Sequence, residues 1–339
     1  MRIAIVTDAW SPQVNGVVRT LQAVSQELGR MGHDVLVVSP DLYASVPCPT
    51  YPEIRLALTR PRAVGERIAA FGAEAVHLAT EGPLCIAARR WCLQRRRPFT
   101  TAYHTQFPDY VSKRTGMPAE WFWRYIRWFH APAEAVLVST PSVRRTLTAH
   151  GIGHVKPWGR GVDVATFRPG ATPPALFADL PRPILLSVGR VAIEKNLEAF
   201  LGGAHPGSRV VVGDGPARAE LEQRFPDAHF LGSLSGADLA GAFAGADAFV
   251  FPSRTDTFGL VMIEALACGT PVAAYPVSGP IDVLTPAVGA MSEDLDEAIA
   301  AALTRDRQAC AAYGQSFTWA ASARQFLDAL VPAPASVAA

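Results

Sequence analysis

Short runs of apolar residues alternate with longer segments of helical spacing along almost the whole chain. Buried strands of a parallel sheet are continuous apolar runs, whereas amphipathic helices repeat their apolar residues with the helical period. The pattern therefore predicts an α/β fold with doubly wound parallel sheets. The first series of expected strands covers residues 2–7, 34–39, 75–79, 98–103, 135–140 and 154–157, and the second covers 184–188, 209–212, 228–231, 248–251 and 271–274.

A proline-rich segment at residues 168–183 separates the two series of strands. Clusters of proline interrupt regular structure, so this segment is the expected domain boundary. We expect one Rossmann-like domain at residues 1–170 and a second at 171–316. An amphipathic segment at 317–330 predicts a last helix. Ligands of such sheets bind at the carboxyl ends of the strands, so the loops that follow the strands are the candidate sites.

The composition supports a globular protein and argues against several other classes. Of the 339 residues, 49% are hydrophobic and 18% are charged, which is enough for two buried cores. The five cysteines are scattered without Cys-x-x-Cys pairs, which argues against disulfides and a zinc site. No apolar run approaches the length of about 18 residues that a membrane span needs, and the N-terminal run is too short for a signal peptide. We expect a cytoplasmic protein.

The stretch at residues 252–272 combines two carboxylates, a turn and a helix start between two apolar runs. Asp256 precedes the expected helix at 259–267 and Glu264 lies inside it, which separates them by roughly 10 Å at the helical rise. Between them the free N–H groups of Phe258, Gly259 and Leu260 suit a phosphate or a sugar oxygen. The alternative is that Asp256 is a helix N-cap and Glu264 a solvated helix residue.

Other loops at strand ends carry further candidates. Gly16 follows Asn15 at an expected helix start, where a glycine lets the backbone approach a phosphate, although a turn glycine without a ligand is equally compatible. His104 stands at the end of a strand, and Glu81 follows another. Each has an alternative without a ligand: His104 could be a structural or merely polar residue, and Glu81 could be a helix N-cap.

The second half offers cations and a glycine turn. Arg190 follows a strand and Lys195 lies nearby, so this pair of cations could bind an anionic ligand; surface salt bridges are the alternative. Gly213 and Asp214 belong to the segment GDGPAR, which lacks the third small residue of a dinucleotide fingerprint and thus disfavours NAD. The acidic segment at 294–296 is interpreted as a capped helix start, so no metal is expected.

The spacing Asp256-x7-Glu264 resembles the E-x7-E signature of retaining GT-B glycosyltransferases of family 4, with Asp256 in place of the usual first Glu. The resemblance extends over nearly the whole chain and includes bacterial lipid glycosyl- and mannosyltransferases. It implies the GT-B fold, with an interdomain cleft and a C-terminal helix that crosses back onto the first domain. The residue roles that it implies are sugar binding by Asp256, Phe258, Gly259 and Leu260, ribose binding by Glu264, diphosphate binding by Arg190, Lys195, Asn15 and Gly16, orientation of the reacting face by His104, and a place near the base for Gly213 and Asp214.

The acceptor side is suggested by charge and by aromatic residues. Residues 1–170 contain 21 Lys and Arg against 12 Asp and Glu, a net charge of +9, whereas 171–339 have a net charge of −8. Basic and aromatic residues mix at 88–97 and 113–130, a pattern typical of helices on anionic membrane surfaces, although the aromatic residues could instead be core. Trp121, Trp128 and Glu81 are candidate acceptor contacts. No nucleic-acid motif accompanies the basic residues.

These expectations combine into one hypothesis. The protein would move a hexosyl unit from a UDP- or GDP-sugar to a hydroxyl of a membrane lipid, such as diacylglycerol or phosphatidylinositol, with an α linkage. It would need no metal or other cofactor and would lie peripherally on the inner membrane face. A nucleotide-sugar epimerase on the same fold and a non-catalytic sugar-nucleotide-binding, membrane-docking protein remain as alternatives.

Overall fold

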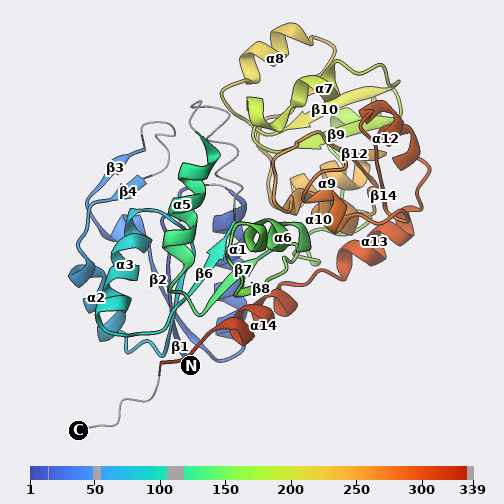
Figure 1. The fold of residues 1–339 in the computed structure, drawn as a ribbon. Helices are drawn as coiled ribbons and strands as arrows, with labels where there is room; N and C mark the ends of the chain where they lie inside the picture. Colours follow the sequence, from blue (N-terminus) through green and yellow to red (C-terminus); the bar gives the residue numbers. More distant parts are fainter. Residues whose placement is uncertain (14, 49–54, 105–117, 334–339) are drawn as a thin grey trace. The chain divides into compact units, whose positions relative to one another are not determined.

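The computed structural model describes residues 1–13, 15–48, 55–104 and 118–333. The chain forms two compact units (Figure 1). The first unit joins Met1–Gly159 to Trp319–Ala339, and the second is the continuous segment Arg160–Thr318. Each unit is built on a six-stranded sheet.

The first unit contains a sheet in the order β2-β1-β5-β6-β7-β8, with every neighbouring pair parallel. All six strands were predicted within two residues of their bounds. A small antiparallel hairpin of β3 and β4 was not predicted. The strands are β1 Arg2–Val6, β2 Asp34–Val38, β3 Ser45–Pro47, β4 Arg55–Ala57, β5 Ala75–Leu78, β6 Thr100–Tyr103, β7 Ala135–Val138 and β8 Val155–Pro157.

Helices cover both faces of this sheet, and alternate residues of β1 show why. Ile3 and Ile5 are fully buried in one core with α1 and α14, whereas Ala4 and Val6 are buried in another with α2 and α3. Successive side chains of a strand point to opposite faces, so an all-apolar strand requires a cover on each. The helices are α1 Gly16–Arg30, α2 Pro61–Ala70, α3 Pro83–Gln94, α5 Ala119–His130, α6 Pro141–Ala149 and α14 Trp319–Ala329, with the short 3-10 helix η1 Pro40–Leu42.

The second unit repeats this design with the strand order β11-β10-β9-β12-β13-β14, again parallel throughout. Its last strand, β14, was not predicted. The strands are β9 Ile184–Val188, β10 Ser208–Val212, β11 His229–Phe230, β12 Ala248–Phe251, β13 Val272–Ala274 and β14 Gly289–Met291. The helices are η2 Ala175–Ala178, η3 Ile193–Lys195, α7 Leu197–Leu201, α8 Arg218–Arg224, α9 Gly236–Gly245, α10 Leu260–Ala267, α11 Pro280–Val283, α12 Leu295–Ala302 and α13 Arg307–Gln315.

The first unit ends at Gly159, earlier than the proline-rich segment led us to expect. The reason is packing: Val162 and Phe167 are 3% and 5% exposed within the core of the second unit. The N–H of Val162 also donates to the carbonyl of Phe317, which places both ends of this segment in the second unit. The last helix accordingly begins at Trp319 rather than at 317, and it packs against α1.

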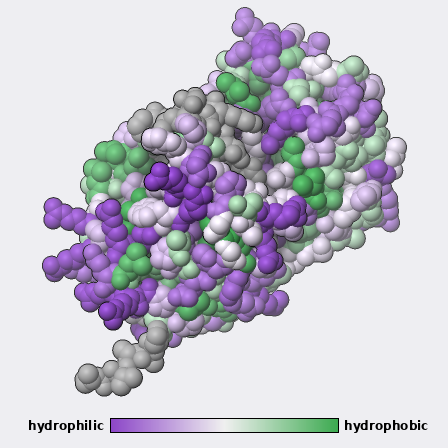
Figure 2. All heavy atoms as spheres, in the orientation of Figure 1, coloured by the Kyte–Doolittle hydropathy of each residue, from purple (hydrophilic) through white to green (hydrophobic). Residues whose placement is uncertain are grey.

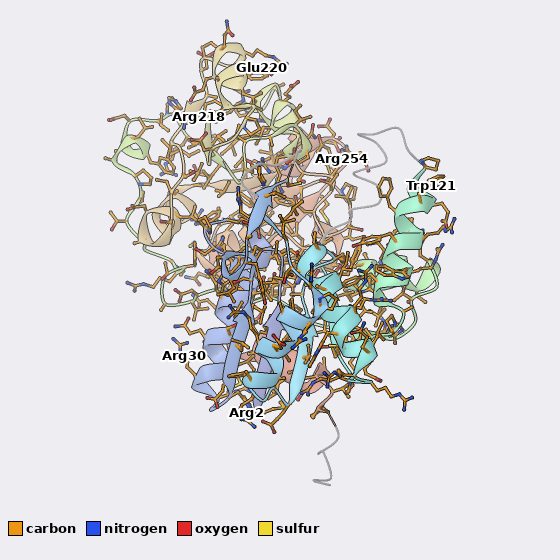
Figure 3. The ribbon with its side chains drawn as sticks, turned by 90° about the vertical axis from the view of Figure 1, so that its left-hand side faces the viewer. Arg2, Arg30, Trp121, Arg218, Glu220 and Arg254 are labelled. Carbon is orange, nitrogen blue, oxygen red and sulfur yellow. The ribbon has the colours of Figure 1, made fainter. Side chains whose placement is uncertain are left out.

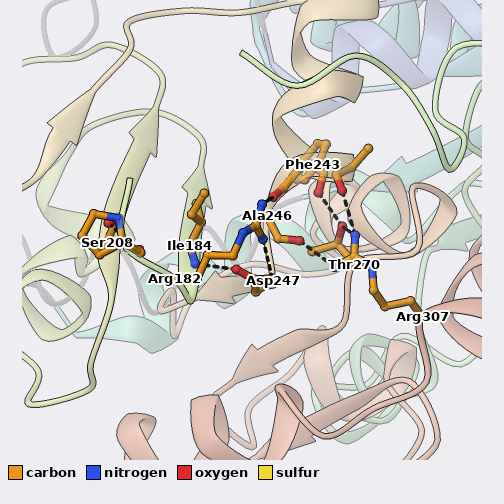
Figure 4. A network of polar contacts seen from close by, with 11 residues as sticks. Arg182, Ile184, Ser208, Phe243, Ala246, Asp247, Thr270 and Arg307 are labelled. Atoms are coloured by element: carbon orange, nitrogen blue, oxygen red, sulfur yellow. Dashed lines mark hydrogen bonds and ion pairs between the residues drawn. The ribbon is translucent and has the colours of Figure 1, made fainter. Parts of the chain in front are cut away.

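A polar network closes the amino end of the second sheet (Figure 4). The Asp247 carboxylate accepts hydrogen bonds of 2.6 Å from both the Arg182 guanidinium and the Ile184 N–H. Arg307 donates to the carbonyls of Ala246 at 2.6 Å and Ala244 at 2.8 Å, where α9 ends. A cation is favourable at a helix C-terminus. These side chains fix the starts of β9 and β12, and the opposite ends of the same strands carry the candidate site.

Candidate active site

The strand order of the second unit reverses between β9 and β12. From β9 the chain continues to β10 and β11 on one side, and it then returns to β12 on the other side. In open α/β sheets, ligands bind outside the carboxyl ends of the strands at such a switch point. The loop after β9 carries Arg190 and leads to Lys195, and the loop after β12 carries Asp256. The topology therefore brings together residues that are far apart in the sequence.

Lys195 and Asp256 form an ion pair at this switch point. The Lys195 Nζ donates to both carboxylate oxygens of Asp256, at 2.7 Å and 2.8 Å. The two side chains are 28% and 24% exposed, so both remain accessible to a ligand. The sequence assigned these two residues to different parts of a donor, whereas the structure shows them in direct contact.

Two further contacts hold this pair in place. Asn196 adopts a left-handed conformation with φ of 53°, which Asn tolerates better than most residues. Its side-chain amide donates to the carbonyl of Pro252 at 3.1 Å and so ties the Lys195 loop to the end of β12. A Cβ at Gly279 would lie 3.0 Å from the carbonyl oxygen of Asp256, so a third loop packs against the main chain of the acid.

The start of α10 explains the glycine that follows Asp256. Gly259 is the N-cap of α10 and has φ of 79°. A Cβ there would lie 2.9 Å from atoms of both Phe251 and Met262, so the backbone and the space each require glycine. Phe258 is 7% exposed, and its side chain belongs to the core. The N-cap interpretation of Asp256 is therefore wrong.

Glu264 lies inside α10, whose residues from Met262 to Ala267 are all buried. The Glu264 side chain is 3% exposed. The alternative of a solvated helix residue is wrong, because the helix presents almost no surface to water. Buried carboxylates are rare unless they have partners or a function.

The loops after β9 and β10 lie against each other. The N–H of Val191 donates to the carbonyl of Asp214 at 2.9 Å. A Cβ at Gly213 would lie 1.8 Å from the carbonyl oxygen of Gly189, so the GDGP turn needs glycine for this close approach. The turn thus borders the loop that carries the exposed Arg190.

Asp214 itself has local partners within the second unit. Its carboxylate accepts the N–H of Gly215 at 2.7 Å and lies 3.3 Å from the Arg218 guanidinium. The side chain of Asp214 is 61% exposed. These contacts describe a turn-stabilising residue, and its predicted place near the base stays a prediction.

The switch point of the first unit lies between β1 and β5, and it contains a residue that the sequence analysis missed. Asp8 accepts the N–H of Leu84 at 2.7 Å, the hydroxyl of Thr80 at 2.9 Å and the N–H of Cys85 at 3.3 Å. The side chain is buried, and this burial raises the pKa of the Asp8 carboxyl above its ordinary value. Gly82 is required here, since a Cβ would lie 2.3 Å from Asp8 Cγ. An acid directly after a buried strand was the available signal.

Asn15 is the N-cap of α1, and Gly16 is its first residue. The side-chain oxygen of Asn15 accepts the N–H groups of Val17 and Val18, both at 3.0 Å. This is the usual chemistry of an Asn N-cap. The proposed contacts of Asn15 and Gly16 with a diphosphate remain predictions. Val14, in the same loop, lies outside the described residues.

Glu81 is held by α5 through two contacts. Its carboxylate lies 3.3 Å from Nε2 of His130, and its main-chain carbonyl accepts a hydrogen bond from the Tyr125 hydroxyl. His130 is fully buried, with its Nδ1 2.8 Å from the Thr101 hydroxyl. No role for His130 was predicted from the sequence. His104 lies at the end of β6, with its ring 5.4 Å from the ring of Trp158.

Helix α5 divides the predicted aromatic cluster into two faces. Trp123 and Phe129 are 3% and 0% exposed and pack in the core, whereas Trp121 and Trp128 are 65% and 42% exposed. Figure 3 shows Trp121 near the start of α5, with its side chain directed outward. Elsewhere, the hydrophobic residues on the face shown in Figure 2 form separate patches among hydrophilic ones. The alternative that the aromatic residues are core thus holds for one face of α5.

The basic segment at 88–97 does not face solvent throughout. Arg89 is 7% exposed and donates to the carbonyls of Trp128 at 2.6 Å and Phe129 at 3.0 Å, where α5 ends. Its guanidinium also lies 4.1 Å from the centre of the Trp128 ring. Arg89 therefore stabilises α5 rather than meeting an outside partner. Residues 113–117 of the second basic segment lie outside the described residues.

Two features of the described residues bear on metals and membranes. No three His, Cys, Asp or Glu side chains gather into a possible metal site in that part of the chain. Asp294 caps α12 by accepting the N–H of Asp296 at 2.9 Å, as the interpretation of the acidic segment requires. Within the same residues, none of the helices has the length and apolar character of a membrane span.

Two doubly wound parallel-sheet units with this topology define the GT-B class of glycosyltransferase folds. Sucrose-phosphate synthase from Thermosynechococcus elongatus has this fold and aligns with a TM-score of 0.79 at 22% identity, over 96% of this chain and 97% of that one. Anabaena HepE, in complex with UDP, aligns with a TM-score of 0.70 at 15% identity, over 97% and 99% of the two chains.

The sequence comparisons identify the family. The model of Glycosyltransferase Family 4 matches residues 14–166, and that of Glycosyl transferases group 1 matches residues 182–305. A GDP-mannose-dependent alpha-mannosyltransferase of Mycolicibacterium smegmatis is 34% identical over 87% of this chain and 85% of its own length. An alpha-monoglucosyldiacylglycerol synthase of Streptococcus pneumoniae is 25% identical over 81% and 71% of the two chains. The chain belongs to glycosyltransferase family 4, and it is a glycosyltransferase.

Proposed function

We propose that this glycosyltransferase moves a mannosyl unit from GDP-mannose to a hydroxyl group of a membrane lipid, with retention of the α configuration. The observation that carries the proposal is the accessible cation and carboxylate of Lys195 and Asp256 at the switch point of the second unit. The choice of donor is supported by the GDP-mannose-dependent relative in Mycolicibacterium smegmatis.

The chemistry follows from the charges of the donor. As the glycosidic bond breaks, the departing nucleoside diphosphate gains negative charge, and fixed cations stabilise that charge most when they are already in position. Lys195 and Arg190 supply this positive charge without a metal ion. Asp256 accepts hydrogen bonds from hydroxyl groups of the sugar, and Glu264 accepts them from those of the ribose. The leaving phosphate takes the proton of the acceptor hydroxyl on the same face, which gives retention.

The remaining residues keep roles within this proposal. The main-chain N–H groups at Phe258, Gly259 and Leu260 hold the sugar, with Gly213 and Asp214 near the base. In the first unit, Asn15 and Gly16 contact the diphosphate, and His104 orients the reacting face of the donor sugar. The Glu81 carboxylate accepts a hydrogen bond from a hydroxyl group of the acceptor.

A lipid acceptor fits the exposed face of α5. Trp121 and Trp128 are exposed together with Arg124 on this helix, and aromatic and basic residues favour the interface of an anionic bilayer. The name of the Streptococcus pneumoniae relative, a glucosyldiacylglycerol synthase, supports the same class of acceptor. We propose that the enzyme lies peripherally on the anionic inner face of a membrane.

Transfer from labelled GDP-mannose into a lipid extract tests the donor, acceptor and linkage together. We expect a lipid-soluble product whose label α-mannosidase releases and β-mannosidase does not, formed equally with and without EDTA. Calorimetric titration should show tighter binding of GDP than of UDP. A labelled product from UDP-glucose alone would overturn the donor, a β linkage would overturn retention, and loss of activity in EDTA would overturn the metal-free mechanism.

Binding to vesicles tests the membrane surface separately. Trp121→Ala should weaken sedimentation with phosphatidylglycerol-containing vesicles several-fold, because an exposed indole contributes at the interface. Arg62→Ala, an exposed arginine on α2, is a control for general loss of positive charge. Equal binding of the wild type and Trp121→Ala would contradict the assignment of this helix face to the membrane.

A further inference from the structure

The ion pair of Lys195 and Asp256 joins two groups for which the proposed function has separate uses. The cation is meant for the diphosphate and the carboxylate for the sugar, yet the Nζ of Lys195 contacts both oxygens of Asp256 at 2.7 Å and 2.8 Å. An ammonium group has three donors and the carboxylate oxygens are its natural partners. While paired in this way, the two side chains have no net charge to offer an anion.

The cation nearest to Asp256 in the sequence has other partners. Arg254, two residues before Asp256, lies 3.0 Å from Glu293 and 3.6 Å above the ring of Tyr275. Asp256, by contrast, is ion-paired with Lys195. The pair is also positioned by loops on both sides, through Asn196 and Gly279.

The pair is weak enough to be broken by a ligand. Both side chains are about a quarter exposed, at 28% and 24%, and ion pairs in contact with water contribute little to stability. A diphosphate carries more charge than one carboxylate, so it can displace Asp256 from Lys195. The displaced carboxylate then lies beside the bound anion, where like charges repel unless sugar hydroxyls satisfy its oxygens.

We propose that Lys195 exchanges Asp256 for the diphosphate when the donor binds, and that Asp256 takes Lys195 back once the sugar has left. This inference rests on the proposed donor site. Asp256 thereby acts twice, as a ligand of the sugar and as a competitor that loosens the nucleoside diphosphate product. A sugar nucleotide satisfies both side chains, whereas the product satisfies only the lysine. The exchange favours the donor over the product at the same site.

Titration of GDP and of inorganic pyrophosphate into the full-length protein tests the exchange. Asp256→Asn removes the competing charge but keeps the size of the side chain. We expect it to bind GDP about five- to tenfold more tightly than the wild type, as the loss of one competing ion pair and one repelling charge implies. Asp256→Glu, which keeps the charge, should return the affinity toward that of the wild type. Asp227→Asn, an equal charge change at an exposed site in the same unit, should leave it within twofold.

A double-mutant cycle shows whether the effect passes through the lysine. In a Lys195→Ala background, the further change Asp256→Asn should tighten GDP much less than in the wild type, because no pair is left to break and only the repulsion between Asp256 and the anion is relieved. Circular dichroism and thermal unfolding of each variant establish that it is folded. Turnover of Asp256→Asn should nevertheless fall, since the sugar loses its carboxylate.

The outcomes separate this inference from the proposed function. Weaker GDP binding in Lys195→Ala, together with unchanged or weaker binding in Asp256→Asn, would overturn the exchange but leave the donor site standing. Unchanged GDP and pyrophosphate binding in Lys195→Ala would overturn the donor site itself. Tightening by Asp256→Asn that is equally large with and without Lys195 would also overturn the exchange, because simple repulsion would then explain all of it.

Discussion

The two units have the same kind of switch point but use it differently. In the first unit, the carboxylate of Asp8 is buried and accepts the N–H groups of Leu84 and Cys85 in the first turn of α3. In the second unit, Lys195 and Asp256 are partly exposed and face each other. One switch point is thus closed by an internal anion, and the other keeps a cation that an outside anion can reach.

The difference shows that topology alone does not locate a ligand. A helix N-terminus attracts anions through its free N–H groups, and at α3 the protein already supplies that anion. The same type of residue, an aspartate directly after a strand or in the loop that follows one, is structural at Asp8 and available at Asp256. Burial and hydrogen-bond partners distinguish the two roles.

Removal of the exposed cation should produce the largest effect on function. We expect Lys195→Ala to lower kcat/KM for sugar transfer by about 100- to 1000-fold, the usual loss when one fixed group that stabilises developing charge is removed. The free energy of unfolding should change by less than about 0.5 kcal/mol, since the side chain is accessible and its ion pair is weak. Steady-state kinetics and urea unfolding measure the two quantities.

Lys156→Ala is the matched control, because Lys156 is an exposed lysine on β8. It should leave both quantities unchanged. Wild-type turnover in Lys195→Ala would show that Lys195 has no role in transfer, and the second switch point would then not differ from the first in function.

Removal of the buried anion should act on stability instead. Asp8→Ala leaves the N–H groups of Leu84 and Cys85 and the hydroxyl of Thr80 without their acceptor, and we expect a loss of about 2–3 kcal/mol in the free energy of unfolding. Asp34→Ala, at an exposed position on the neighbouring β2, should change it by less than about 0.5 kcal/mol. If both variants unfold at the same urea concentration as the wild type, Asp8 does not hold the first unit together as described.

The pH dependence of stability gives the smallest and most specific test. Burial raises the pKa of Asp8 in the folded state above its value of 3.8 in the unfolded chain, so the folded state binds the proton more tightly. The contribution of Asp8 to stability therefore falls as the pH rises from the unfolded pKa through the raised one, with a slope of at most about 1.4 kcal/mol per pH unit. Above that window the contribution is constant.

Asp8→Asn should lack this slope, because an amide does not titrate there. Urea midpoints measured between pH 4 and pH 7 for the two proteins give the comparison. A wild-type curve parallel to that of the variant would show that burial does not perturb the carboxyl of Asp8.

The strands could be predicted well because each is a buried apolar run. The bounds of β9 and β12 agree with the prediction at both ends. The strand β14, Gly289–Met291, was missed because its three residues include a glycine and an alanine and carry no pattern of their own. Its pairing with β13 is a tertiary property. The hairpin of β3 and β4 was missed for a similar reason, since three-residue strands give too short a period to recognise.

The candidate site likewise has a part that could be predicted from the sequence and a part that could not. The sequence indicated Lys195 and Asp256 as candidates, because both lie in loops after apolar strands and their chemistry suits a charged sugar donor. It did not reveal that they touch, nor that Asp8 and His130 are buried beside partners far along the chain. Such contacts depend on which strands become neighbours, and residue spacing does not contain that information.

The division of the chain also has a consequence for synthesis of the protein. The second unit is one continuous segment, whereas the first needs α14, whose Phe326 is fully buried in the same core as Ile3 and Ile5. Domains fold as units while a chain emerges from the ribosome. The second unit can therefore fold during translation, while the unit that begins the chain must wait for its last helix and leaves part of its core uncovered until then.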